Sequence, residues 1–326
     1  MSTLLIYTGG TIGMVKNSEG SLAPFSLDEM LTFCPELSGR INANTLKCIS
    51  TESIKDSSNI TPNDWLTLRG VILDNHQGHD NILILHGTDT MAYTSSALSF
   101  LLSSFNKNIV FTGAQRPISE ENSDGKFNLL DSLLLLDELS KSDIKGQTLL
   151  NFGGKTFLGN RVSKASTEVF DAFSGREFNA KEAQSAFDNV IVFDHVQAIE
   201  TNIRLVKMYP GIEIDKLISG LLTDSPKGVV FESFGSGNMP ENIELISGLT
   251  KLIAQGIIIL NVSQCVKGLV DMSTYQTGQQ LLKIGVLDGK NLTTESALTK
   301  LMLVLSVPEE DNSKLIITSI AGEFTK

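Results

Sequence analysis

Residues 4–13 read LLIYTGGTIG, a short, mostly apolar run followed by a pair of glycines. Such a run suits a strand that is buried on both faces of a sheet, and the glycines let the chain turn sharply at its end. Ligands of open α/β sheets bind beyond the carboxyl ends of the strands. Thr11 is therefore expected to present its hydroxyl to a ligand, although a tight turn without any ligand fits the same pattern.

Strand and helix patterns alternate outward from this stretch. Strand-like runs lie at residues 82–85, 109–112, 148–152 and 190–193, and helical patterns begin at residues 61, 90 and 125. Thr61 and Pro62 supply a capping hydroxyl and a first-turn proline, and in the third helix Leu130, Leu133 and Leu134 are expected to face inward. This order predicts an α/β fold with a larger, doubly wound, mostly parallel sheet and right-handed crossovers.

A smaller α/β unit is predicted to follow. The patterns weaken towards Tyr209, Pro210 and Gly211, which form a turn signal, and resume with strands at 229–231 and 257–262 and a last helix at 294–305. We therefore assign residues 1–187 to an N-terminal domain that carries the chemical motifs, residues 188–210 to a linker, and residues 211–326 to a smaller C-terminal α/β domain.

The composition is that of a globular protein, since 41% of the 326 residues are hydrophobic and 19% are charged. The formal net charge of −11 disfavours nucleic acids and anionic membranes as partners, because both attract clustered Lys and Arg. No apolar run approaches the ~18 residues of a membrane-spanning helix, and the first residues lack the pattern of a secretory signal. Three widely spaced cysteines fit a reducing compartment, so a cytoplasmic location is expected.

A second polar loop, HGTDT at residues 86–90, follows the strand-like run at 82–85. Thr11 and Thr88 could therefore lie on two loops that converge on a small polar ligand, although Asp89 or Thr90 could instead cap the next helix. His86 is expected to orient this loop rather than to act as a base.

A third segment, GNRVSK at residues 159–164, ends in a lysine. A lysine beside a threonine hydroxyl can accept its proton when burial or nearby cations disfavour the ammonium form, whereas a carboxylate such as that of Asp89 favours it. A lone lysine is usually a surface residue, and spacing alone does not bring Lys164 to Thr88. His76 and His79 fit a polar helix end better than a metal site, since only Asp80 accompanies them.

Together these segments resemble the bacterial L-asparaginases, specifically their cytoplasmic type I branch. The matching motifs occur in family order: TGGTIG (8–13), DSS (56–58), HGTDTMAY (86–93), TGAQ (112–115), SDG (123–125), GNR (159–161), GSGN (235–238) and SQC (263–265). The resemblance covers essentially the whole chain, and the two threonine motifs together are highly specific.

The resemblance implies hydrolysis of L-asparagine to L-aspartate and ammonia, without metal or organic cofactor. It implies Thr11 as the nucleophile, with Thr88, Asp89 and Lys164 as a second catalytic set; whether Thr11, Thr88 or water attacks first stays open. The substrate-binding residues that it implies are Gly10, Asp56, Ser57, Ser58, Gly87 and Ala114. A threonine would form an aspartyl ester that water resolves, and the family forms homodimers and homotetramers.

Two positions depart from the family pattern. Ser21 stands where family members commonly carry a tyrosine close to the nucleophile, so activation of Thr11 would depend more on the Thr88 set. Glu232 stands where some type I enzymes use an arginine to hold regulatory asparagine, so we expect weak or absent activation by substrate.

Three rival functions remain. The first is an enzyme that prefers L-glutamine. This substrate is longer than L-asparagine by one methylene, a difference that an enzyme discriminates by only ~1–3 kcal/mol. The second is the amidohydrolase that acts on glutamyl-tRNA, which usually has an N-terminal extension. It binds a nucleic acid, and the acidic net charge of this chain disfavours such a partner. A non-catalytic amino-acid sensor would be expected to lose a threonine or the lysine, and none is missing.

Overall fold

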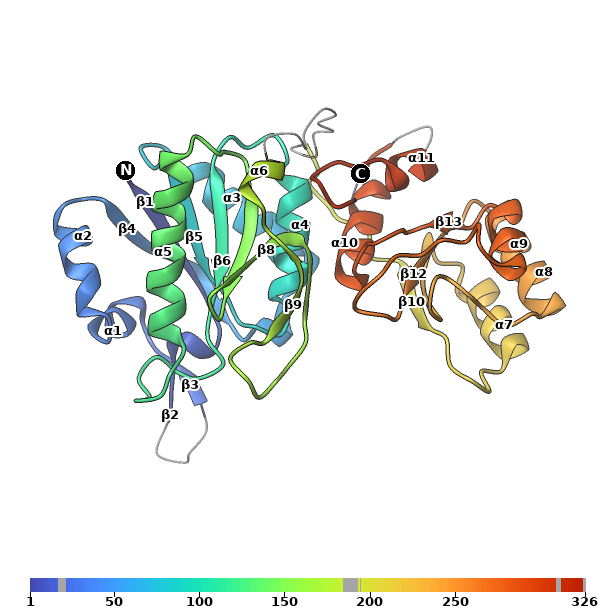
Figure 1. The fold of residues 1–326 in the computed structure, drawn as a ribbon, viewed down its shortest axis with the longest axis horizontal. Coiled ribbons are helices and arrows are strands. Elements are labelled where there is room, and N and C mark those ends of the chain that lie inside the picture. The colour runs from blue at the N-terminus through green and yellow to red at the C-terminus, as the bar shows by residue number, and fades with distance from the viewer. Residues whose placement is uncertain (17–21, 184–192, 194, 309–311, 325–326) are drawn as a thin grey trace. The chain divides into compact units, whose positions relative to one another are not determined.

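The computed structural model describes residues 1–16, 22–183, 193, 195–308 and 312–324 (Figure 1). The chain divides into two compact units, Met1–Asp194 and His195–Lys326, and each has its own mostly or wholly parallel sheet. None of the described helices is long and apolar enough to cross a membrane.

The first unit is built on a seven-stranded sheet. Across the sheet the strands are β4 (Leu46–Lys55), β1 (Thr3–Gly9), β5 (Asn81–Leu85), β6 (Asn108–Thr112), β7 (Thr148–Phe152), β8 (Lys155–Lys164) and β9 (Phe173–Glu177). All pairs from β4 to β7 are parallel, and the last two pairs are antiparallel. The predicted doubly wound, mostly parallel sheet is confirmed.

Helices cover both faces of this sheet. One face packs against α5 (Gly125–Lys141) and α1 (Leu27–Thr32) in a core that includes Leu5, Leu83 and Leu133. α4 (Met91–Leu101) contributes nothing to that core and packs instead against β8 and α3 (Pro62–Asn75). The connections from β5 to β6 and from β6 to β7 run in the same direction across the sheet, but their helices, α4 and α5, lie on opposite faces. One of these two crossovers is therefore left-handed, whereas the sequence predicted right-handed crossovers.

The inward face of α5 differs from the prediction. Leu133 is buried, but Leu134 is 57% exposed and Leu130 only partly buried, while Leu129 and Leu136 fill the core. The run of leucines at 129–130 and 133–136 surrounds most of the helix, so its periodicity does not identify one face.

The start of α3 follows from its sequence. Asp64 accepts hydrogen bonds from the backbone nitrogen of Thr61 at 2.8 Å and from its hydroxyl at 2.7 Å, and Pro62 occupies the first turn. The predicted start of the helix is therefore confirmed, and Asp64 also pairs with Lys55, the last residue of β4, whose ammonium lies 2.6 Å away.

The second unit has four parallel strands in sequential order: β10 (Ile203–Lys207), β11 (Gly228–Ser233), β12 (Ile258–Ser263) and β13 (Leu287–Asp288). Its helices are α7 (Ile214–Asp224), α8 (Ile243–Ala254), α9 (Gln276–Ile284), α10 (Thr294–Val304) and α11 (Asn312–Ile317). β10 lies inside the stretch assigned to a linker. Residues 188–192 and 194 of that stretch, and with them most of the strand-like run at 190–193, fall outside the described residues.

Short elements complete the first unit. They are β2 (Met14–Lys16), β3 (Leu22–Pro24), α2 (Ser38–Asn42) and α6 (Ala180–Ala183), with 3-10 turns η1 (Thr11–Gly13), η2 (Pro35–Leu37) and η3 (Ser57–Asn59). Two of these turns, η1 and η3, follow β1 and β4 at the carboxyl edge of the sheet.

Candidate active site

The chain reverses its winding between β1 and β5. From β1 it moves to β4 on one side, whereas from β5 it moves to β6 on the other. Loops that leave neighbouring strands in opposite directions open a crevice at the carboxyl edge, where ligands of such sheets bind. The loops that carry Thr11 and Thr88 are the two that leave these strands, and Thr8 joins them by donating a 2.9 Å hydrogen bond to the Leu85 carbonyl.

Glycines bring three loops into contact at this crevice. A side chain at Gly10 would collide with the backbone of Gly87, and one at Gly87 would lie 2.5 Å from the Ser57 hydroxyl oxygen. Gly10 also has a φ of 91°, which favours glycine. The loops after β1, β4 and β5 therefore meet backbone to backbone, with Thr11 and Thr88 adjacent to the contact.

Lys164 joins the second threonine to its neighbouring carboxylate. Its ammonium lies 2.7 Å from Thr88 Oγ1 and 2.7 Å from Asp89 Oδ1. The Lys164 side chain is 17% exposed and that of Asp89 is 60% exposed, so one end of the set is buried and the other faces solvent. The structure thus brings together three of the predicted catalytic residues, although Lys164 is 76 positions from Thr88 in the chain.

Thr11 opens the short turn η1 rather than a strand or helix. The turn is closed by a 3.1 Å hydrogen bond from Gly13 N to Gly10 O, and Ile118 N donates to Ile12 O at 3.1 Å. Ile12 is fully buried beneath the turn while Thr11 is half-buried. Ser21, which stands where the family carries its loop tyrosine, lies outside the described residues.

The predicted substrate-binding loop after β4 is folded by its own aspartate. Asp56 Oδ1 accepts hydrogen bonds from the backbone nitrogen and the hydroxyl of Ser58, both at 2.8 Å. Ser57 is buried, and its carbonyl accepts a 2.7 Å hydrogen bond from the Thr90 hydroxyl. Thr90 thus ties the β4 loop to the β5 loop, and Ser58 is left exposed.

The loop after β6 adds a residue that the sequence analysis did not select. Gln115 accepts from the Thr88 hydroxyl at 3.4 Å through Oε1 and donates to the Ser166 carbonyl at 3.1 Å. The Asp124 carboxylate holds this loop by accepting from the backbone nitrogens of Gln115 and Arg116. The TGAQ and SDG motifs were the signal for this bridge, but only contacts distant in sequence reveal it.

Ala114 lies in the same loop and is buried. A side chain at the preceding Gly113 would collide with the His86 carbonyl, so the β6 loop packs directly against the β5 loop. The backbone at Ala114 is therefore held at the same edge as Thr88, where the resemblance expects it.

His86 is a neutral donor in this site. It is 1% exposed, and burial lowers the pKa of its imidazole to about 4. Nδ1 lies 2.8 Å from the Gly87 carbonyl oxygen, which can only accept, so Nδ1 carries the proton. The geometry suits a residue that orients the Gly87–Thr88 backbone and not a base at neutral pH.

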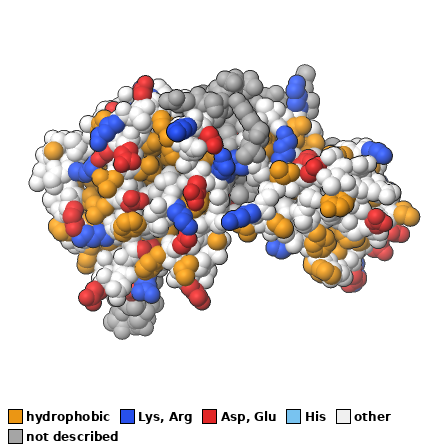
Figure 2. Space-filling view, in the orientation of Figure 1, with side chains coloured by type: hydrophobic (Ala, Val, Ile, Leu, Met, Phe, Trp, Pro, Cys, Tyr) orange, Lys and Arg blue, Asp and Glu red, His pale blue; other side chains and the backbone are white. Residues whose placement is uncertain are grey.

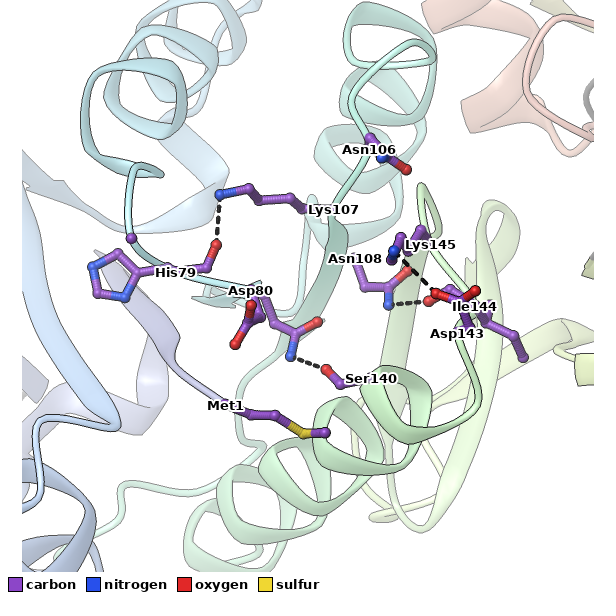
Figure 3. Close-up of a pocket in the computed structure, with 12 residues that line it drawn as sticks. Met1, His79, Asp80, Asn106, Lys107, Asn108, Ser140, Asp143, Ile144 and Lys145 are labelled. Carbon is purple, nitrogen blue, oxygen red and sulfur yellow. Dashed lines mark hydrogen bonds and ion pairs between the residues drawn. The ribbon is translucent and has the colours of Figure 1, made fainter.

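A polar cavity of about 580 Å³ lies at the opposite edge of the sheet (Figure 3). Its lining includes Asn81 and Asn108, the first residues of β5 and β6. Lys107 donates to the carbonyls of His76 and His79 there, which caps the end of α3. Among the described residues, no group of three or more His, Cys, Asp or Glu side chains is arranged to hold a metal.

Comparisons with known proteins agree with this geometry. A family model described as Asparaginase, N-terminal matches residues 2–195, and one described as Glutaminase/Asparaginase C-terminal domain matches residues 202–315. L-asparaginase 1 of Escherichia coli (strain K12) is 34% identical over 341 residues, which cover 99% of this chain and 98% of that protein.

Two solved structures extend the comparison. The crystal structure of L-asparaginase I from Vibrio cholerae has a TM-score of 0.83 and 30% identity over 100% of this chain and 99% of that one. The thermostable L-asparaginase from Thermococcus kodakarensis has a TM-score of 0.83 and 29% identity over 100% of both chains. Matched in both of its units and aligned end to end with the E. coli relative, the chain belongs to the asparaginase family.

Proposed function

We propose that this protein hydrolyses L-asparagine to L-aspartate and ammonia by threonine-based amide hydrolysis through an acyl-enzyme. The observation that carries the proposal is the Lys164 ammonium, 2.7 Å from both Thr88 Oγ1 and Asp89 Oδ1, beside the contact between Gly10 and Gly87. Its catalytic residues are Thr11, Thr88, Asp89 and Lys164.

The substrate is held by its charged α-groups. The exposed carboxylate of Asp89 binds the α-ammonium in a charge-assisted contact, which favours free amino acids over peptides. Ser57 and Ser58 bind the α-carboxylate through hydroxyl and main-chain donors, at the loop that Asp56 folds. Backbone N–H groups near Thr88 and Ala114 stabilise the oxyanion that forms on the amide oxygen.

Thr11 is the better placed nucleophile of the two threonines. Thr88 is 6% exposed and its hydroxyl is already bonded to Lys164 and Gln115, whereas Thr11 Oγ1 has no hydrogen-bond partner within the described residues. When the substrate's α-ammonium becomes the partner of Asp89, the charged form of Lys164 loses part of its stabilisation. Lys164 can then take the proton of the attacking hydroxyl through Thr88.

The proposed reaction has two steps, formation of the ester and its hydrolysis. Thr11 oxygen bonds to the amide carbon, and its proton, relayed through Thr88 and Lys164, goes to the amide nitrogen, which leaves as ammonia. Water then adds to the ester carbon, the carbon–Thr11 bond breaks, and L-aspartate leaves with the Thr11 hydroxyl restored.

Ammonia release from L-asparagine tests the proposal. Thr11→Ala, Thr88→Ala and Lys164→Met should each lower kcat by at least roughly 10²-fold, since positioned proton transfer contributes about 10²–10⁴. Lys155→Met is the matched control, because Lys155 lies on the same strand but pairs with Asp171 at the surface. Equal release by the wild type and both threonine variants would reject the enzyme and favour an amino-acid sensor.

L-glutamine remains the substrate alternative. A steady-state comparison of kcat/KM for the two amides decides it, and a larger value for L-glutamine would reassign the enzyme as a glutaminase.

We also propose a cytoplasmic location and self-association as a homodimer or homotetramer. The three cysteines are free thiols, as in a reducing compartment. Phe127 and Leu134 of α5 are both more than half exposed. Figure 2 shows apolar side chains gathered on this face, and such exposed patches mark association surfaces. Light scattering of Leu134→Lys against wild type tests the assembly, and an unchanged mass would remove this face from it.

A further inference from the structure

A buried tyrosine stands directly behind the turn that carries Thr11. Tyr7 is the fifth residue of β1 and is fully buried within the core shared with α5. Its hydroxyl donates a 3.0 Å hydrogen bond to the carbonyl of Gly13, the last residue of the turn η1. Phe25 N donates to the same carbonyl at 3.0 Å.

The backbone of the η1 turn packs directly against the Tyr7 side chain. A side chain at Gly13 would collide with the Tyr7 hydroxyl, so the turn lies directly on the phenol. At the other end of the turn Gly10 lies against Gly87. Thr11 therefore stands between two supports, the β5 loop on one side and the Tyr7 phenol on the other.

The hydroxyl adds little to the packing of the core. The core that contains Tyr7 is built largely of aliphatic side chains, among them Leu5, Leu85 and Ile12, and a phenylalanine would pack in such a core equally well. A buried hydroxyl also has to be hydrogen-bonded to offset its loss of water, and the net gain from such a bond is small. The hydroxyl therefore matters more for the position of the η1 turn than for the stability of the protein.

We propose that Tyr7 is a positioning residue for the hydrolytic reaction, whose phenol hydroxyl holds the η1 turn at the distance from which Thr11 can attack. This inference rests on the proposed asparaginase function and on Thr11 as its nucleophile. It gives the site a rigid support for Thr11 from the sheet itself.

The phenol acts as a donor and not as an acid or base. Burial raises the pKa of Tyr7 to about 12, so its proton stays in place throughout the pH range in which such an enzyme is assayed. Because the side chain is fully buried, it acts on the reaction only through the turn.

Tyr7→Phe tests the inference, since it keeps the ring and removes only the hydroxyl. We expect kcat for L-asparagine to fall roughly 10- to 100-fold, because a displacement near 1 Å can cost about 10²-fold. KM should change little, since the loops after β4 and β5 keep their supports, and the shape of the pH profile should stay that of the wild type. Rates are normalised to the fraction that binds L-aspartate, so that a partly folded variant still gives a result.

Ile84→Val is the matched control. Ile84 is fully buried in β5, so this variant lowers stability without touching the turn. Unchanged kcat in Tyr7→Phe, or a fall no larger than that of Ile84→Val at equal loss of stability, overturns the positioning role. A changed alkaline limb of the pH profile overturns the donor role. Wild-type protein that releases no ammonia overturns the proposed function instead, so the two failures are distinguishable.

Discussion

At the scale of single residues, the site combines groups whose chemistry depends on their surroundings. Lys164 reads from the sequence as an ordinary surface lysine, yet it is mostly buried and bonded to Thr88 and Asp89. Gln115 lies within a matched motif, but a glutamine in a loop has no distinctive pattern that would single it out. His86 was expected to orient its loop, and its contact with Gly87 is the one such a role requires.

The buried imidazole of His86 predicts a pH-dependent stability. Its pKa is lowered from 6.5 to about 4 by burial, so the unfolded chain binds the proton more readily than the folded one. The neutral form contributes full stability above pH 6.5, and that contribution is lost as pH falls towards 4, to a total of roughly 3 kcal/mol.

Chemical denaturation of wild type and His86→Gln at several pH values measures this effect. The carboxylates titrate in both proteins, so the difference between their two curves isolates the histidine. Parallel curves between pH 7 and pH 4 would contradict the prediction.

At the scale of elements, glycines decide which strand ends can meet. Local patterns predicted the strands β1, β5, β6 and β7 and the cap of α3, since these depend on neighbouring residues. Leu134 on α5 was predicted wrongly because several faces of that helix are apolar. The approach of the β1, β4 and β5 loops depends on positions at which no side chain fits.

Gly87→Ala tests the contact between these loops. Its new methyl group would lie 2.5 Å from the Ser57 hydroxyl oxygen, so we expect Ser57 to shift and KM for L-asparagine to rise. Gly70→Ala is the control: Gly70 lies within α3 with nothing within 4 Å of the added methyl, and alanine there should stabilise the protein by about 0.5–1 kcal/mol. An unchanged KM in Gly87→Ala would separate Ser57 from substrate binding.

At the scale of the whole molecule, a buried ion pair holds the C-terminal segment of the second unit. Lys300 of α10 and Glu323 near the C-terminus form an ion pair at 2.5 Å in which both side chains have no exposed surface. Glu323 also accepts from the backbone nitrogens of Ile320 and Ala321. The pair therefore ties the C-terminal segment to the core of this unit.

Breaking this pair should destabilise the second unit strongly. Removing one partner of a buried ion pair typically costs about 3–5 kcal/mol, so Glu323→Gln should lower the free energy of unfolding by about this amount. Lys216→Met, which breaks the exposed pair with Glu213, should cost less than about 1 kcal/mol. Similar losses in the two variants would show that burial does not decide the effect.

Regulation by substrate is expected to be weak or absent. Glu232 is 14% exposed through its side chain, accepts a 2.5 Å hydrogen bond from the Thr294 hydroxyl and lies 3.5 Å from the Lys207 ammonium. A carboxylate held there repels the carboxylate of a regulatory asparagine. Rates should therefore rise hyperbolically with L-asparagine; a sigmoidal curve that Glu232→Gln abolishes would contradict this.

The amino-acid sequence by itself determined the buried strands, the caps, the glycine turns and the identity of the threonine motifs, because each of these depends on residues that are close along the chain. Only the tertiary structure decided that Lys164 meets Thr88, that Gln115 bridges two loops and that Tyr7 supports the Thr11 turn. Thr88 and Gln115 meet because the parallel strands β5 and β6 carry the residues that follow them to one edge of the sheet, whereas Lys164 reaches Thr88 from β8, which runs antiparallel to β7. Their geometry there depends on packing between segments that no local pattern relates.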